Sequence, residues 1–204
     1  SDSGARMRGK HRTPAALAAY RVVDLSDSVG GQFCARLFAD MGAAVTLIEP
    51  AGGSATRRIG PFDRKGRSLP FFHLNFNKEI LGQPAAGDEM DRLLRAADVV
   101  VASRGLDGRQ ASALNADVVL VEVTPFGTDG PLSHWKAPEI VLQALSGMMN
   151  NNGTPGREPL YGVGQRASYA AGVAAYAGAV AALFARNAGS GGQRVAVDAA
   201  ETAA

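Results

Sequence analysis

The chain has 204 residues, of which 46% are hydrophobic and 20% charged, and its formal net charge is +2. This length and balance are typical of one substantial globular domain with a sizeable core. The small net charge gives no electrostatic reason to expect nucleic acid or an anionic membrane as a partner. No apolar run approaches the roughly 20 residues needed to cross a bilayer, so we expect no membrane span.

Cys34 is the only cysteine of the chain. It excludes an intramolecular disulfide, and we therefore expect a reducing, cytoplasmic compartment. Its place in a predicted helix favours a buried core thiol over a reactive one. Residues 1–19 are polar and basic and contain no secretory core, so we interpret them as a flexible arm that is solvated rather than bound to phosphate. The domain itself is predicted to span residues 20–204.

Two apolar runs rich in β-branched residues, 21–25 and 44–48, predict buried strands. Helical spacing between them predicts a helix that ends at Gly42, and Gly30 and Gly31 are expected to form the turn before that helix with positive φ. The result is a βαβ unit, the start of a parallel sheet covered by helices.

A dinucleotide is disfavoured as the ligand of this unit. The Gly-x-Gly-x-x-Gly fingerprint needs three spaced glycines, and this turn has only Gly30 and Gly31. Glu49 ends the second strand, where an acid that binds ribose would lie, but an acid at a strand end is common.

The rest of the chain continues the alternation of helices and strands. Residues 51–80 predict an irregular segment packed through its aromatic side chains. Helices are predicted over 88–97, 111–114, 139–149 and 168–185, and strands over 98–101, 116–123 and 193–197. The apolar character of 168–185 on all sides indicates a buried helix. We therefore predict an α/β fold, a Rossmann-like parallel sheet flanked by helices.

Short motifs occur along residues 20–201 in the order of a known family. They are Arg21-Val-Val-Asp-Leu-Ser, Phe38-Ala-Asp-Met-Gly-Ala-Ala-Val with Ile48-Glu-Pro, Asn75-Phe-Asn-Lys, Ala97-Asp-Val-Val-Val, Phe126-Gly-Thr-Asp-Gly-Pro, Gln143-Ala-Leu-Ser-Gly-Met-Met, Ala179-Val-Ala-Ala-Leu-Phe-Ala-Arg and Gly192-Gln-Arg-Val-Ala-Val-Asp. In this order they resemble the amino-terminal half of the class III CoA-transferases, which include formyl-CoA transferase, carnitine CoA-transferase and α-methylacyl-CoA racemase.

The resemblance implies coenzyme A as a substrate and no metal. Family members are about twice this length, carry a second, smaller domain and interlock as two rings. We expect this chain to lack that second domain, either as an excised portion or as a short subunit. A homologous catalytic chain or a homo-oligomer would then complete it, burying a large apolar face that is otherwise left bare.

The family's catalytic groups are expected to be missing. Its transferases use an aspartate nucleophile just before the long helix, and Ser168 takes that place here. Its racemases add a histidine where this chain has Pro138. Ser168 lacks a recognisable histidine relay, so a helix N-cap is favoured over a nucleophile. Glu139 matches a family acid near the active site and is expected to keep a structural hydrogen bond.

Cations that could meet the phosphates of CoA follow from the same resemblance. Lys136 matches a family position that approaches CoA, whereas Pro50 replaces the usual basic residue after the second strand. The other candidates are Arg57, Arg58, Lys78, Arg104 and Arg109. A solvated surface role stays open for each of them.

Three functions are compatible with these residues. The first is a CoA-transferase-like subunit of acyl-CoA metabolism that lacks its own nucleophile and works with a catalytic partner chain. The second is a non-catalytic scaffold that stabilises a homologous CoA-transferase. The third is an independent activity centred on Ser168 or Glu139, which the missing aspartate disfavours.

Overall fold

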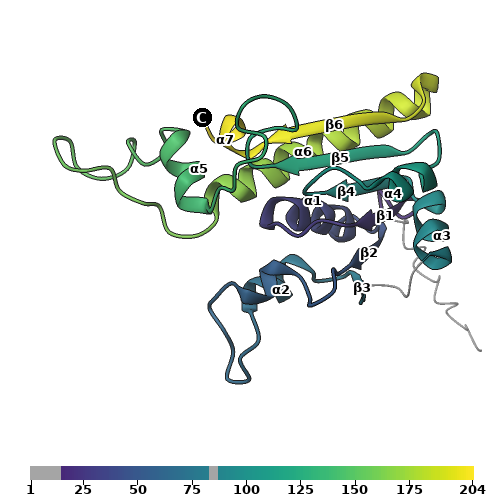
Figure 1. Cartoon of the computed structure of the whole chain (residues 1–204), viewed down its shortest axis with the longest axis horizontal. Coiled ribbons are helices and arrows are strands. Elements are labelled where there is room, and N and C mark those ends of the chain that lie inside the picture. Colours follow the sequence, from purple (N-terminus) through teal and green to yellow (C-terminus); the bar gives the residue numbers. More distant parts are fainter. Residues whose placement is uncertain (1–14, 83–86) are drawn as a thin grey trace, which may run out of the picture.

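The computed structural model describes residues 15–82 and 87–204, and these form a parallel sheet between two layers of helices (Figure 1). The strand order is β3-β2-β1-β4-β5-β6, and every neighbouring pair is parallel. The strands are β1 (Arg21–Asp24), β2 (Ala44–Ile48), β3 (Glu79–Leu81), β4 (Val99–Ala102), β5 (Val119–Thr124) and β6 (Gln193–Asp198). The predicted α/β class and parallel sheet are confirmed.

The helices lie where most of them were predicted, with shifted ends. They are α1 (Val29–Asp40), η1 (Ala55–Arg58), α2 (Leu69–Leu74), α3 (Asp88–Ala96), α4 (Gly108–Ala113), α5 (Glu139–Leu145), α6 (Arg166–Ala185), the π-helical turn η2 (Arg186–Ser190) and α7 (Ala199–Ala203). The helix expected over 139–149 is shorter than predicted, because Gly147 takes a positive φ of 78°.

The core has two parts because successive strand residues point to opposite faces of the sheet. Val99 and Val101 of β4 pack with α1 and α6, while Val100 between them packs with α3. All three are fully buried. The strands are continuous apolar runs in the sequence because helices cover both faces of the sheet.

The expected glycine turn before α1 is wrong. Gly30 and Gly31 lie inside the first turn of α1, where the Ser28 hydroxyl caps the helix by accepting from Gly31 N at 3.2 Å. The glycines are needed for close packing rather than for positive φ. A Cβ on Gly30 would lie 2.9 Å from the carbonyl oxygen of Ser168, and one on Gly172 would lie 2.7 Å from the Gly30 oxygen. These contacts bring α1 and α6 together.

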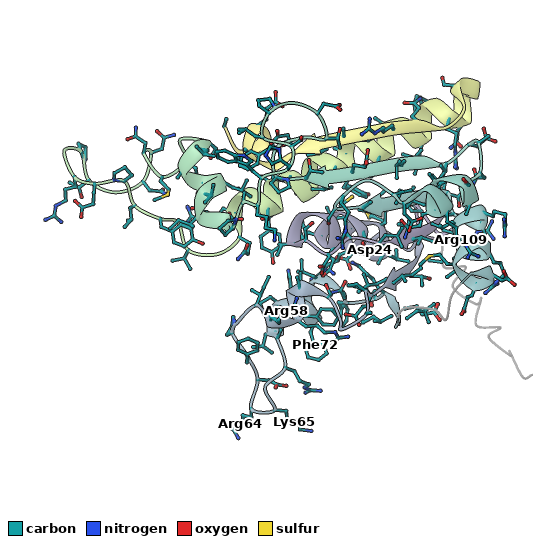
Figure 2. All side chains as sticks on the ribbon, viewed as in Figure 1. Asp24, Arg58, Arg64, Lys65, Phe72 and Arg109 are labelled. Carbon is teal, nitrogen blue, oxygen red and sulfur yellow. The ribbon has the colours of Figure 1, made fainter. Side chains whose placement is uncertain are left out.

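The segment 51–80 is more ordered than predicted. It contains η1, α2 and the edge strand β3, which pairs with β2. Of its aromatic side chains only Phe71 is buried, whereas Phe62, Phe72 and Phe76 are largely exposed. The loop between η1 and α2 projects from the body of the molecule, with Arg64 and Lys65 at its tip (Figure 2).

Helix α6 is half covered rather than buried on all sides. By length and composition alone, the helical segment Arg166–Ser190 is apolar enough to cross a bilayer, so the expectation of no such segment is wrong on that count. Its buried residues recur at helical spacing and pack against α1 and the sheet, as in the core helix of a globular domain (Ala167, Ala171, Ala175 and Ala179). Val173 and Phe184 face outward with exposures of 51% and 78%.

Large apolar side chains are also exposed on α5 and the loop after it, at Ile140, Leu145, Leu160 and Val163. The partner expected to cover them stays a prediction. Residues 16–19 of the predicted arm form a turn, and Leu17 N donates to the backbone oxygen of Met41 at 3.1 Å. Residues 1–14 of the predicted arm lie outside the described part of the chain.

Candidate functional site

Three hollows follow the edge of the sheet at which its parallel strands end. The first cleft, about 270 Å³, lies beyond β1, β2 and β4 between Glu49 and Arg104. The second cleft, about 410 Å³, lies beyond β4, β5 and β6, and it shares Arg104 with the first. The inner pocket, about 70 Å³, shares Thr124 with the second cleft and reaches Ser168. Open α/β sheets bind ligands at this edge, where the strand order reverses between β1 and β4.

Glu139 and Ser168 are joined at the inner end of this row. The Glu139 carboxylate is buried and accepts hydrogen bonds from Ala167 N at 2.7 Å, Ser168 N at 3.2 Å and Ser168 Oγ at 2.7 Å. Gln143 Nε2 donates to it at 2.9 Å. Because the amino-terminal N–H groups of a helix lack intrahelical partners, a carboxylate there stabilises the helix.

The predicted capping role of Ser168 is therefore wrong. Ser168 is the third residue of α6, and the N-cap residue Gln165 makes no side-chain cap. Glu139 of α5 supplies the cap from a distant part of the sequence. The hydrogen bond expected for Glu139 is confirmed.

Ser168 and Glu139 are poorly arranged to act as a nucleophile and its general base. Ser168 Oγ donates to Glu139, and no histidine hydrogen-bonds to either group in residues 15–82 and 87–204. His73 instead stacks edge-on with Tyr169 at 6.3 Å between ring centres. A serine needs a positioned base to act as a nucleophile. Among the described residues, the one group that accepts from Ser168 Oγ is the Glu139 carboxylate, which is engaged with the end of α6.

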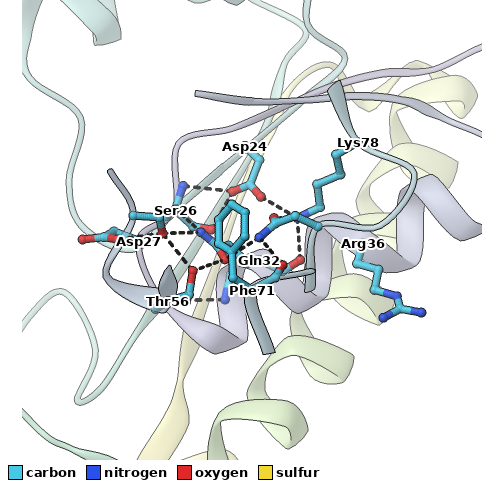
Figure 3. A network of polar contacts seen from close by, with 12 residues as sticks. Asp24, Ser26, Asp27, Gln32, Arg36, Thr56, Phe71 and Lys78 are labelled. Carbon is cyan, nitrogen blue, oxygen red and sulfur yellow. Dashed lines mark hydrogen bonds and ion pairs between the residues drawn. The ribbon is translucent and has the colours of Figure 1, made fainter. Parts of the chain in front are cut away.

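A buried polar network underlies the first cleft (Figure 3). The Lys78 ammonium donates to Asp24 Oδ2 at 2.8 Å, to the backbone carbonyl oxygen of Gln32 at 2.8 Å and to Asn75 Oδ1 at 2.9 Å. The side chains of Lys78 and Asp24 are fully buried. Burial lowers the pKa of Lys78, and the Asp24 carboxylate opposes that shift. With three donors and three acceptors in place, Lys78 has no donor left for the phosphate predicted from the sequence.

Gln32 extends the network to the segment 51–80. Its Nε2 donates to Ser54 Oγ at 2.7 Å, and its Oε1 accepts from Thr56 Oγ1 at 2.7 Å and from Asn75 Nδ2 at 3.0 Å. The side chain is fully buried in α1. Sequence reasoning missed it, although a glutamine on the apolar face of a predicted helix is a signal of a buried hydrogen-bonded group.

Of the other candidate cations, Arg104 is the one that lines these three hollows of the described structure. Arg57 donates to both oxygens of Glu49 at 2.7 Å and lies 3.8 Å over the Phe71 ring. The hydrogen bonds from Arg57 hold the pKa of Glu49 below its ordinary range. Arg104 is exposed and lines the first and second clefts. Lys136 is exposed between a residue of the second cleft and one of the inner pocket.

Arg109 and Arg58 also line none of these three hollows. Arg109 pairs with Asp91 at 3.1 Å and joins α4 to α3, and Arg58 is exposed at the end of η1 (Figure 2). Conversely, sequence reasoning missed Arg194, which donates to Thr128 Oγ1 at 2.9 Å and pairs with Glu122 in the second cleft. Nothing in the alternation of β6 distinguishes Arg194 from an ordinary exposed cation.

The fold is a Rossmann-like α/β domain with a row of hollows along the carboxyl edge of its sheet. The family model described as CoA-transferase family III matches residues 17–204, so the chain belongs to that family. It is 33% identical to the succinyl-CoA:(R)-benzylsuccinate CoA-transferase subunit BbsE of Thauera aromatica, over 86% of this chain and 47% of that protein. It is 32% identical to the succinyl-CoA–D-citramalate CoA-transferase of Chloroflexus aurantiacus, over 90% of this chain and 49% of that protein.

The fold is also found in solved structures. A CAIB/BAIF family protein from Brucella suis superposes with a TM-score of 0.84 at 25% identity, over 94% of this chain and 55% of that chain. The chain thus spans about half the length of the curated relatives that it matches.

Proposed function

We propose that this chain binds a CoA thioester along the carboxyl edge of its sheet and acts as a CoA-transferase-like subunit of acyl-CoA metabolism. A homologous catalytic chain supplies the nucleophile in this proposal, and the assembly works in the cytoplasm. The observation that carries the proposal is the hydrogen bond of Ser168 to Glu139 at 2.7 Å. The resemblance puts the family's nucleophilic aspartate at Ser168, and here that position carries a hydroxyl directed at a capping carboxylate.

The row of hollows supports binding of an extended ligand. CoA is long, with a nucleotide at one end and a thioester at the other. The first cleft suits the nucleotide because of its size and its mixed apolar and polar walls. The inner pocket is small and lies beside Ser168, which suits the thioester end. Arg104 lies between the two clefts, where a cation meets the diphosphate.

A scaffold without CoA binding is the second candidate, and one observation favours it. Three of the predicted phosphate ligands are engaged within the chain, Lys78 by Asp24, Arg57 by Glu49 and Arg109 by Asp91. Pro50 also carries no charge at the position where the family has a basic residue.

A calorimetric titration of CoA and of acetyl-CoA into the purified chain separates these candidates. The proposal expects saturable binding with a micromolar Kd, equivalent to about −8 kcal/mol. Arg104→Ala should weaken it, and Arg95→Ala, at the opposite edge of the sheet, should leave it unchanged. No heat up to about millimolar ligand would assign the chain to the scaffold class.

A further inference from the structure

The first cleft has an unusual balance of charge for a site that meets phosphates. Its floor is apolar and includes Leu25, Ile48 and Met90. Three carboxylates border it, from Asp27, Glu49 and Asp107, against the single cation Arg104. This arrangement was not predictable from the sequence, because Asp27 and Asp107 lie in separate loops that the fold brings to one edge.

Two of these three carboxylates are held by hydrogen bonds from uncharged groups. Glu49 is neutralised by Arg57, which donates to both of its oxygens. Asp27 Oδ1 accepts from Ser54 Oγ at 3.0 Å and from Ala55 N, and Asp107 Oδ1 accepts from Gln110 N at 2.8 Å. In the part of the chain that the structure describes, neither Asp27 nor Asp107 forms an ion pair.

A carboxylate discriminates between a hydroxyl and a phosphate on a ribose. An ionised carboxylate only accepts hydrogen bonds, and a ribose hydroxyl donates one. A phosphate ester offers only acceptors at neutral pH and is repelled by the like charge. The cleft therefore favours a nucleoside with both ribose hydroxyls free. Its one lining cation, Arg104, also lines the second cleft, which suits a 5′-diphosphate that extends toward the second cleft.

We infer that the first cleft selects adenosine nucleotides that carry no phosphate on the ribose 2′ or 3′ oxygen. This inference rests on the proposed function, since it assigns the nucleotide end of the ligand. It implies that the chain binds 3′-dephospho-CoA more tightly than CoA, and ADP more tightly than adenosine 3′,5′-bisphosphate. The second pair carries the same number of phosphates, placed on one ribose oxygen in ADP and on two in the bisphosphate.

The test is calorimetric titration of these four nucleotides into the whole chain. The inference expects each ribose-unphosphorylated nucleotide to bind at least about threefold more tightly than its partner, from a like-charge interaction at the effective dielectric of a surface site. Asp107→Asn should reduce that ratio, because asparagine caps α4 as well as aspartate but carries no charge. Asp117→Asn, at the amino edge of the sheet, is the matched control and should leave the ratio unchanged.

Equal or tighter binding of CoA than of 3′-dephospho-CoA overturns the inference, and so does a ratio that Asp107→Asn leaves unaltered. Lack of binding by ADP overturns it as well. If ADP binds with the expected preference while CoA and 3′-dephospho-CoA both fail, the cleft assignment stands and the proposed function is what fails.

Discussion

Replacing Lys78 by methionine should destabilise the fold more than any surface substitution, because it leaves the buried Asp24 carboxylate without its cation. Both side chains are fully buried and lie 2.8 Å apart. Removing one partner of a buried ion pair costs about 3–5 kcal/mol. Asp24 keeps its hydrogen bonds from Ser26 N at 2.9 Å and from the Ser26 hydroxyl. These two bonds place the expected loss near the lower end of that range.

The assay is urea unfolding followed by circular dichroism, with thermal unfolding as a second readout. For a domain of this size the loss equals a fall in Tm of about 10 °C. Lys65→Met, at the tip of the exposed loop, is the matched control and should change stability by less than about 0.5 kcal/mol. The double variant Asp24→Asn/Lys78→Met should recover part of the loss, since the uncompensated charge is gone. A loss below about 1 kcal/mol, or a double variant no more stable than Lys78→Met, would refute the reasoning.

Three further predictions follow from the packing and the charges. Burial raises the pKa of the Cys34 thiol and seals it, so a thiol reagent should label it only in urea, and labelling of the native chain would contradict the burial. Because folding lowers the pKa of Glu49, its ionised carboxylate contributes stability at neutral pH, and this contribution is lost as the pH falls through the folded-state pKa. Arg57→Gln should therefore destabilise the chain at pH 7, and its difference in stability from wild type should shrink in acid. A pH-independent difference would argue against this. Gly172→Ala should cost about 1–3 kcal/mol in urea unfolding through overpacking against α1, while Gly108→Ala, where a Cβ meets nothing within 4 Å, serves as its neutral control.

Most of the sheet was predictable because its strands are short, nearly continuous apolar runs. Residues 21–25 and 44–48 were predicted as strands because they are apolar runs rich in β-branched residues, and both contain strands of the sheet. The edge strand β3 was missed because three residues, Glu79–Leu81, with one partly buried side chain leave almost no pattern. The strand is defined by its pairing with β2, which is a property of the tertiary fold.

The site was less predictable because its contacts join distant parts of the sequence. Glu139 was expected to keep a hydrogen bond, but the sequence did not show that it caps α6, 28 residues away at Ala167. Lys78 was one of the cations that could meet a phosphate or lie solvated on the surface, and the structure buries it instead. Its burial depends on Asp24, which lies 54 residues earlier. Such pairings follow from the fold and leave no local signature.

The central claim is that this chain holds a CoA thioester without forming a covalent intermediate of its own. The most direct measurement is the intact mass of the chain, together with the free CoA released, after incubation with acetyl-CoA at a concentration that saturates binding. We expect an unmodified mass and no release of CoA, because Ser168 stands at the position of the family's nucleophilic aspartate and its hydroxyl donates to Glu139. An acetyl group found on Ser168 or Glu139, with an equal amount of CoA released, would contradict it.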